Sequence, residues 1–125
     1  MTYFTEIEGR EVKDSFPEFY HEAGRFFEIL HKEQPIGFVA IGKLNAEDCV
    51  LGLFVSQEYR NTLSKSFVFS VLDLPGRLNF KRCVMMTTKK TILKLFRKMK
   101  KYGIFEHGII NHEPAFIKEY HGFYS

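Results

Sequence analysis

Short apolar runs bounded by polar turns fill the first half of the chain. Residues 25–33 and 36–44 are each rich in Phe, Ile and Val, and Gln34-Pro35 separates them. Runs of this length with turn residues at their ends are typical of β-strands. The pattern therefore predicts a β-hairpin over about residues 26–44.

A third strand is predicted after the polar turn at residues 45–48. The sequence CVLGLFV, residues 49–55, is apolar almost without interruption. A continuous apolar run, unlike an alternating one, indicates a strand that is buried on both faces.

After Gln57 the apolar residues recur at steps of three and four, which is the period of a helix. The helix is expected to start near Thr62 and to be ended by Pro-Gly-Arg at 75–77; its apolar positions are Leu63, Phe67, Val71 and Leu74. Residues 80–88 are strand-like again. Because strand-helix-strand connections place their strands in one sheet, we expect residues 49–55 and 80–87 to be neighbouring strands.

The clearest helical pattern lies between residues 87 and 103. Thr87 or Thr88 can cap its start and Gly103 can end it. Its apolar face consists of Ile92, Leu95, Phe96 and Met99. This pattern predicts an amphipathic helix packed on the sheet.

The two ends of the chain differ in how clearly they can be interpreted. Residues 104–111 and 115–124 resemble two strands joined by a turn at 112–114, whereas the segment up to Gly24 is only loosely helical and contains Pro17. The order of elements predicts an α/β protein with a mixed central sheet. That sheet should be antiparallel at its start, with a parallel strand-helix-strand core.

Length and composition are those of one globular domain. The chain has 125 residues, of which 45% are hydrophobic, and its fourteen Phe and six Tyr predict an aromatic core. It has no basic start followed by an apolar run and no apolar stretch of about 20 residues, so we expect a cytoplasmic protein without a membrane span. Cys49 and Cys83 match no zinc or redox spacing and are expected to be reduced core thiols.

Charge is distributed unevenly along the chain. Residues 1–55 hold five Lys/Arg and ten Asp/Glu, a net −5, whereas residues 56–125 hold thirteen and five, a net +8. Two interpretations remain open: one face of the fold binds an anion, or the two halves neutralise each other.

Seven basic residues are concentrated in the segment 89–101, namely Lys89, Lys90, Lys94, Arg97, Lys98, Lys100 and Lys101. The simplest interpretation is a solvated outer face. A surface for nucleic acid, an acidic partner or cofactor phosphates is the alternative. Nucleic acid is not favoured, because no aromatic residues alternate with the charges to stack on bases.

Other catalytic and metal-binding patterns are absent from the sequence. The five histidines, His21, His31, His107, His112 and His121, have no metal-ligand spacing, so no metal site is predicted. No serine stands in a nucleophile-elbow motif.

Three segments together resemble the GNAT superfamily of acyl-CoA-dependent N-acyltransferases. Residues 51–72, LGLFVSQEYRNTLSKSFVFSVL, are similar to the family's strand-loop-helix signature; residues 80–105 are similar to its next strand and helix; and residues 104–120 are similar to its final hairpin. The likeness covers about residues 26–124. It implies one GNAT-like domain over residues 1–125, with an N-terminal helix or loop segment at 1–25 and a core at 26–124.

The resemblance implies a cofactor loop with a changed turn. Family members follow an R/Q-x-x-G-x-G/A pattern whose backbone N–H groups and helix N-terminus hold the pyrophosphate of acetyl-CoA or another acyl-CoA. The implied cofactor-binding residues here are Phe54, Val55, Arg60, Asn61, Thr62, Leu63, Ser64 and Lys65. The turn contains no glycine and is one residue shorter, but the hydroxyls of Thr62 and Ser64 and the charge of Lys65 remain suited to an anion.

For catalysis, the resemblance points to a tyrosine that protonates the departing thiolate. The family's position falls on Phe96 or Met99 in this chain, and Tyr102 follows near the end of the helix. Tyr102 is therefore the implied general acid, with core packing or an exposed helix end as the alternative. Glu47 and Asp48 precede a strand, where a role in the turn is simpler than a role as general base.

Two functions of different classes follow from the resemblance. The first is an N-acyltransferase that transfers an acyl group from acyl-CoA to an amine on a small molecule or protein. The second is a non-catalytic GNAT-like protein that contacts phage or host proteins, since the chain is also similar to GNAT-like proteins of short-tailed phages, including internal virion proteins. The second function places it in the host cytoplasm or the virion.

Overall fold

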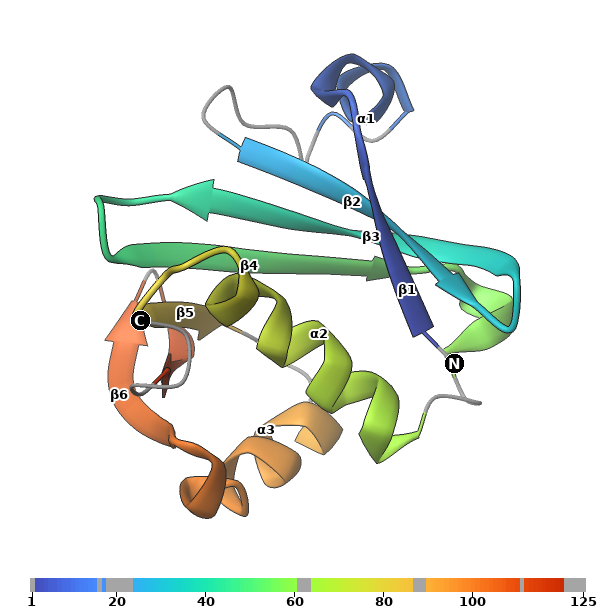
Figure 1. Ribbon diagram of the computed structural model, residues 1–125. Coiled ribbons are helices and arrows are strands. Elements are labelled where there is room, and N and C mark those ends of the chain that lie inside the picture. The colour runs from blue at the N-terminus through green and yellow to red at the C-terminus, as the bar shows by residue number, and fades with distance from the viewer. Residues whose placement is uncertain are drawn as a thin grey trace. The chain divides into compact units, whose positions relative to one another are not determined.

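A computed structural model of the protein describes residues 2–15, 17, 24–60, 64–86, 90–110 and 112–120. Figure 1 shows the arrangement of its elements. The strands are β1 (Thr2–Ile7), β2 (Gly24–His31), β3 (Gln34–Lys43), β4 (Asp48–Val55), β5 (Arg82–Met86), β6 (Ile104–Ile110) and β7 (Glu113–Glu119). The helices are α1 (Gly9–Ser15), α2 (Lys65–Arg77) and α3 (Lys90–Arg97), with short 3-10 helices η2 (Gln57–Tyr59) and η3 (Lys100–Tyr102).

The strands form one mixed sheet in the order β1-β2-β3-β4-β5-β7-β6. β4 and β5 are parallel, with Cys49 opposite Cys83, and α2 lies between them in the chain. The pairings of β1 with β2, β2 with β3, β5 with β7 and β6 with β7 are antiparallel. The α/β class and the adjacency of the two central strands expected from the sequence are confirmed.

The hairpin predicted over residues 26–44 exists, but its turn lies two residues earlier than expected. Lys32 and Glu33 form the turn, and both have positive φ angles, 52° and 66°. Pro35 pairs with Leu30 inside the hairpin, next to a register shift between Ile29 and Leu30. Since proline is tolerated in a strand at such an irregularity, it marks a bulge here and not the turn.

Several boundaries and burial expectations need correction. Residues 2–7 form β1, which their sequence pattern did not indicate. Leu53 is exposed, so β4 is not buried on both faces along its whole length. The helix expected from Thr62 begins at Lys65 and continues through Pro75 to Arg77. The predicted caps Thr87 and Thr88 lie outside the described residues.

The second predicted helix is shorter than its sequence pattern. α3 ends at Arg97, and the amides of Lys98 and Met99 then bond to carbonyls three residues back, those of Leu95 and Phe96. This tightened backbone leads into η3, which Gly103 closes in the left-handed conformation, with φ 81°. The apolar face is retained, because Phe96 and Met99 are both buried.

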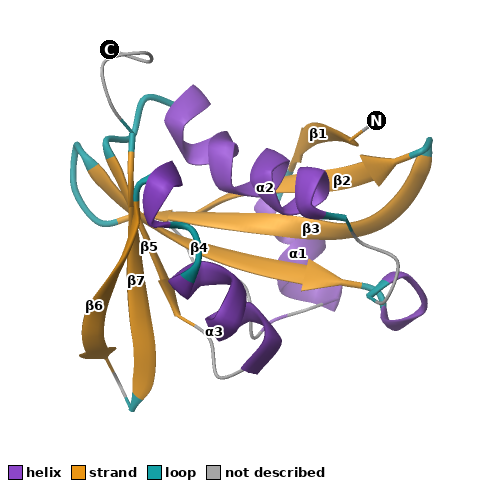
Figure 2. Cartoon of the chain, turned by 90° about the horizontal axis from the view of Figure 1, so that it is seen from below, coloured by secondary structure: helices purple, strands orange, loops and turns teal. Residues whose placement is uncertain are grey.

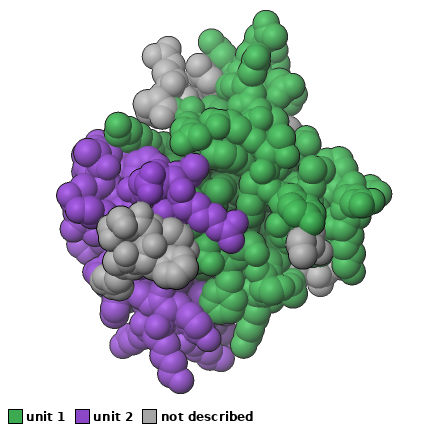
Figure 3. Space-filling view, viewed as in Figure 1, with its two compact units in different colours: residues 1–43, 51–74 green, residues 44–50, 75–125 purple. Residues whose placement is uncertain are grey.

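The contacts divide the chain into two compact units, coloured separately in Figure 3. Unit 1 consists of residues 1–43 and 51–74, and unit 2 of residues 44–50 and 75–125. Unit 1 carries seven Lys/Arg and ten Asp/Glu, a net −3, and unit 2 carries eleven and five, a net +6. The division gives each unit its own electrostatic character.

In unit 1, helices cover both faces of the sheet (Figure 2). Val12 of α1 packs with Phe26 and Phe38 in one buried cluster. On the opposite face, the ring of Phe67 in α2 meets the ring of His31 edge-on, with centroids 6.1 Å apart. The alternation of side chains along β2 and β3 therefore supplies two apolar surfaces, one for each helix.

In unit 2, charged residues join the starts of β4 and β5. Arg82 contacts Asp48 at 2.7 Å and Glu47 at 3.4 Å, and Lys81 contacts Glu47 at 3.2 Å. Hydrogen bonds from Asn45 and Arg82 lower the pKa of Asp48. These pairs match the interpretation in which the acidic and basic halves neutralise each other.

The two cysteines lie in the core of unit 2. Cys49 and Cys83 face each other across the parallel pair, and both are free and fully buried. A hydrogen bond with Cys49, together with burial, raises the pKa of the Cys83 thiol well above its ordinary value. The Cys83 thiol is therefore held in the neutral form.

Among the described residues, no helix is long and apolar enough to cross a membrane.

Candidate functional site

The predicted cofactor loop starts where β4 ends. Phe54 is half-buried, Val55 is buried, and Ser56 donates its backbone N–H to the carbonyl of Ile36 at 2.8 Å. This bond extends the β3–β4 pairing by one residue before the chain turns into η2. Asn61, Thr62 and Leu63 lie outside the described residues.

Arg60 folds back onto the strand end. Its Nε donates to the carbonyl oxygen of Val55 at 2.8 Å, and its guanidinium lies over the ring of Phe54, 6.0 Å from the centroid. The contact holds the cation beside the start of the loop. This bond uses one of the five N–H groups of the guanidinium. The other four point in other directions within the plane of the group.

Ser64 is the N-cap of α2. Its hydroxyl accepts the backbone N–H of Phe67 at 3.3 Å and lies 2.8 Å from the hydroxyl of Ser66. A serine in this position satisfies one of the helix's unpaired N–H groups. Ser64 therefore has a structural role as a helix cap. The sequence alone indicates only that its hydroxyl can bind an anion.

Lys65 is the first residue of α2 and is exposed. Within the described ranges it has no acidic partner. Its ammonium group and the N-terminus of a 13-residue helix are together a favourable place for a negative charge. Lys65 and Arg60 are the exposed cations among the predicted cofactor residues that the structure describes.

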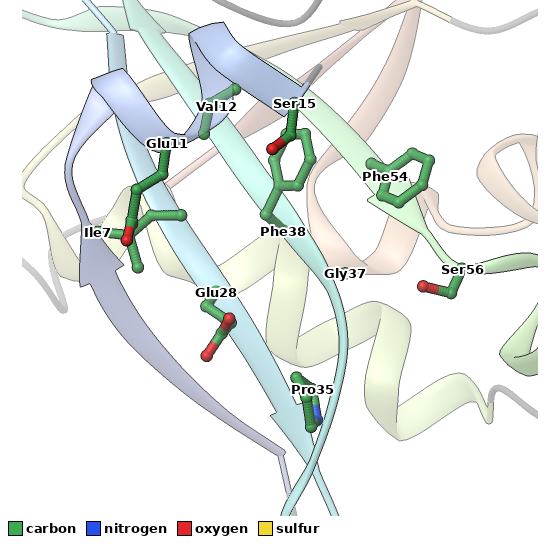
Figure 4. Close-up of a pocket in the computed structure, with 10 residues that line it drawn as sticks. All are labelled: Ile7, Glu11, Val12, Ser15, Glu28, Pro35, Gly37, Phe38, Phe54 and Ser56. Carbon is green, nitrogen blue, oxygen red and sulfur yellow. The ribbon is translucent and has the colours of Figure 1, made fainter.

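A groove of about 360 Å³ lies beside the end of β4, between α1 and the sheet (Figure 4). It is lined by Ile7, Glu11, Val12, Ser15, Glu28, Pro35, Gly37, Phe38, Phe54 and Ser56, all of which belong to unit 1. Its floor contains the stacked rings of Phe38 and Phe54, whose centroids are 5.4 Å apart. Phe54 therefore belongs both to the predicted cofactor loop and to the groove.

Gly37 allows β3 and β4 to approach each other at the floor of the groove. A Cβ added at Gly37 would lie 2.0 Å from the carbonyl oxygen of Phe54. Only glycine fits at that separation, because the atoms that a Cβ would meet are backbone atoms of Phe54 and Val55, which cannot move aside as a flexible side chain can.

Two carboxylates enter the groove from different elements. Glu28 comes from the central part of β2 and Glu11 from α1, and Figure 4 shows both side chains directed into the space between helix and sheet. Neither has an ion-pair partner in the part of the chain that the structure describes. Sequence reasoning missed both; the available signal was a charged residue at 28, between Phe26 and Leu30 on one face of an apolar strand.

Tyr102 is the last residue of η3, in unit 2. Its side chain is 53% exposed, and its backbone carbonyl accepts a hydrogen bond from Nζ of Lys118. Core packing, one alternative for this residue, is excluded by the exposure. The role of Tyr102 as a general acid remains a prediction.

The remaining candidates from the sequence take part in turns and ion pairs. Glu47 and Asp48 belong to the ion pairs that join β4 and β5, and Asn45 Oδ1 accepts their backbone N–H groups at 2.8 Å, so a turn-forming role is confirmed. On the basic segment, Arg97 pairs with Glu106 at 2.9 Å. Among the described residues there is no group of three His, Cys, Asp or Glu that would hold a metal ion.

The groups that surround the loop fit an acyl-CoA diphosphate in chemical type. The free N–H groups of Arg60, the Lys65 ammonium and the first turn of α2 are all donors or positive charges on one short segment. The turn itself has no glycine at residues 60–65, so its side chains keep a diphosphate further from the backbone N–H groups than in the family pattern.

Solved structures of GNAT acetyltransferases share this fold. A GNAT family acetyltransferase from Elizabethkingia anophelis with acetyl-CoA bound matches with a TM-score of 0.65 and 12% identity, over 95% of this chain and 98% of that one. A chimera of the spermidine N-acetyltransferase SpeG from Vibrio cholerae and hSSAT gives 0.67 and 14%, over 94% of each chain. The N-acetyltransferase PseH from Campylobacter jejuni, in complex with acetyl coenzyme A, gives 0.62 and 10%, over 95% and 99%.

No protein-family model matches the sequence, and no curated protein matches it. At 10–14% identity, the structural likeness defines the fold alone. The chain therefore has the fold of GNAT acetyltransferases, along nearly its whole length.

Proposed function

We propose that this protein is an N-acyltransferase that uses acetyl-CoA or another acyl-CoA and transfers the acyl group to an amine. The main support is one observation on a GNAT fold. A groove with two carboxylates that have no ion-pair partner among the described residues lies directly beside the strand end where the predicted cofactor loop begins. Carboxylates attract amines in their protonated form, and the neighbouring loop carries the positive charge that a diphosphate needs.

The residues of this chain divide the task by their chemistry. Arg60, Lys65 and the first turn of α2 would hold the diphosphate of the cofactor, which supplies an activated acyl group when bound. The groove would bind and orient the amine. In the balanced reaction a C–N bond forms, the C–S bond breaks, the amine loses a proton and CoA leaves as a thiol; Tyr102 is the proposed donor of the proton to sulfur.

For the acceptor, we propose a small molecule or a protein side chain with an amine. The SpeG chimera with this fold is a spermidine N-acetyltransferase by its name, which is consistent with an amine acceptor. A reducing, cytoplasmic setting is proposed from Cys49 and Cys83, which are both free thiols.

A second function is favoured by the internal contacts of the loop. Arg60 is bonded to Val55, Ser64 caps α2, and residues 61–63 are Asn-Thr-Leu with no glycine. These features support the alternative of a non-catalytic GNAT-fold protein, a phage virion or host-interaction component that has lost CoA turnover. The exposed lysines of unit 2 would then bind an acidic partner. Nucleic acid is the less favoured ligand for the same lysines.

Acetyl-CoA binding separates the two functions. We expect calorimetry to detect binding of acetyl-CoA, and we expect a small rise in melting temperature, because the turn has no glycine to bring the backbone close. Consumption of acetyl-CoA should then be measured with a panel of amines. Absence of both binding and thermal shift, with the protein folded, would reject the enzyme and favour the non-catalytic alternative.

A further inference from the structure

We propose that the outer edge of β6, in unit 2, binds an extended acidic segment of another protein as an added strand. The acidic side chains of that segment would lie on the α3 face of the sheet and its apolar side chains on the opposite face. The proposal rests on the second function above only in naming its acidic partner. It uses none of the residues assigned to acyl-CoA or to the groove, so it is tested without either ligand.

The first observation is that β6 is the last strand of the sheet. Among the described residues it has one neighbouring strand, β7, and Figure 2 shows it outermost beside that strand. Every residue from Phe105 to Ile109 is exposed. An edge strand of this kind presents backbone N–H and C=O groups that can pair with another chain.

The bonding pattern of β6 and β7 shows which backbone groups face this edge. Glu119 donates its N–H to the carbonyl of Gly103 at 2.9 Å. Since hydrogen-bonded pairs alternate with non-hydrogen-bonded ones in an antiparallel ladder, Ile104 and Glu106 turn their N–H and C=O groups away from β7. The N–H of Ile104 agrees with this direction, because it bonds to the carbonyl of Met99 instead. The backbone groups of Glu106 are therefore directed to the free edge.

The second observation is a row of cations beside the same edge. Lys90, Lys94 and Arg97 are spaced by four and three residues, so they share one face of α3. Arg97 contacts Glu106 at 2.9 Å, which directs this face to β6. Lys101 lies in η3, which also contacts β6. Four cations against one carboxylate leave a net +3 here, and the three lysines have no acidic partner among the described residues.

The third observation concerns the opposite face of the sheet. Because successive side chains of a strand alternate between faces, Phe105 lies on the face away from Arg97 and α3. Its side chain is 44% exposed. A strand that alternates acidic and apolar residues would thus place carboxylates near the lysines and apolar groups near Phe105.

These features favour a peptide over two other occupants. A nucleic acid is attracted by the lysines, but it has no peptide N–H and C=O groups to continue the ladder. A second copy that paired through its own β6 would bring two basic faces together, and like charges disfavour that pairing. The register shift between Glu106 and Gly108 limits the straight part of the edge, so we expect weak binding, with Kd on the order of 100 μM.

Fluorescence anisotropy with a labelled, end-blocked heptapeptide that alternates Glu and Val tests the surface. The matched probe has the same residues with all Glu before all Val, so its charge is equal but the alternation is lost. We expect the alternating peptide to bind at least about 5-fold more tightly, and its affinity to fall as salt is raised. Equal affinity for the two peptides would overturn the proposal, as would equally tight binding of an oligothymidine of the same charge.

Glu106→Pro removes the N–H that faces the edge and keeps the ladder to β7, since proline is tolerated in an edge strand whose N–H faces solvent. We expect this variant to bind the alternating peptide about 5- to 10-fold more weakly, no better than the matched probe. Glu106→Gln is the control: it loses the ion pair with Arg97 but keeps the N–H, and it should bind at least as tightly as the unmodified protein. Equal weakening in both variants would contradict pairing along the backbone.

A charge reversal provides a second test if Glu106→Pro does not fold. Lys90→Glu combined with Lys101→Glu changes two exposed side chains and should weaken binding of the alternating peptide by about 10-fold or more. Lys32→Glu combined with Lys43→Glu, at two exposed positions of unit 1, is the matched control and should leave the affinity unchanged. Equal affinities for the two double variants would reject the row of cations as the binding surface.

Sedimentation velocity tests the second copy as occupant. A dimer of the unmodified protein that Glu106→Pro converts to monomer would assign the edge to self-association and overturn the proposal. The proposed enzyme is judged separately. Peptide binding without any acetyl-CoA binding would leave this surface standing and reject the enzyme, whereas turnover of acetyl-CoA without peptide binding would do the reverse.

Discussion

Both units pair some of their carboxylates with basic side chains, but the groove of unit 1 also contains carboxylates without such partners among the described residues. In unit 2, Glu47, Asp48 and Glu106 all contact basic side chains, so their charges are neutralised within the fold. In unit 1, Glu11 and Glu28 remain without such partners among the described residues, inside a groove lined with aromatic rings. The basic segment 89–101 is the most conspicuous charge feature of the sequence, but the concave, unneutralised charge lies in the other unit.

This difference shows where charge is informative. An exposed charge in solvent contributes little, and a charge paired across strands mainly fixes their register. A half-buried charge on an apolar face is costly for the folded protein unless a ligand compensates it. The comparison therefore directs attention to unit 1 for recognition of a small ligand, although unit 2 carries the larger net charge.

The largest expected effect tests whether unit 2 contributes chemistry at all. If the protein turns over acetyl-CoA, Tyr102→Phe should reduce kcat by about 100- to 10,000-fold, the usual effect of removing a general acid. Affinity for acetyl-CoA and the melting temperature should not change, because the hydroxyl is removed from an exposed side chain. Full turnover in the Tyr102→Phe variant would confine the chemistry to other residues; Tyr3→Phe, exposed on β1, is the matched control.

The next effect concerns the close approach of β3 and β4 in unit 1. Gly37→Ala should lower the free energy of unfolding by about 3 kcal/mol or more, since its Cβ would meet the Phe54 carbonyl oxygen at 2.0 Å. Gly42→Ala is the control on the same strand, because a Cβ there meets nothing within 4 Å. Urea denaturation compares the two. Equal midpoints would show that the groove floor is not held by this contact.

The smallest effect decides which unit receives the cofactor's phosphates. Lys65→Glu, at the start of α2, should weaken acetyl-CoA binding by about 1–3 kcal/mol, because a charge-assisted contact becomes a repulsion. Lys94→Glu, the same change at another exposed lysine on α3 of unit 2, should have little effect. The reverse result in calorimetry would assign the phosphates to the basic segment of unit 2.

Much of the fold was accessible from local pattern. The hairpin of β2 and β3, the parallel pair of β4 and β5 and the final pair β6 and β7 all follow from short apolar runs with clear ends. Periodicity also indicated α2 and α3, since both bury one face. Periodicity did not indicate β1, an edge strand whose burial alternates only weakly. It also did not indicate where α3 ends, because the change to bonds three residues back leaves no mark in the residue spacing.

The candidate site divides along the same line. The sequence itself determined the strand-loop-helix segment, with Arg60 and Lys65 on it, because that segment is continuous in the chain. Only the tertiary structure decided that Ser64 caps a helix, that Arg60 folds back onto Val55, and that Glu11 and Glu28 enter one groove. The physical reason is that pairing and burial are set by contacts between distant segments, so the sequence gives the type of each charge and the fold decides whether that charge is neutralised.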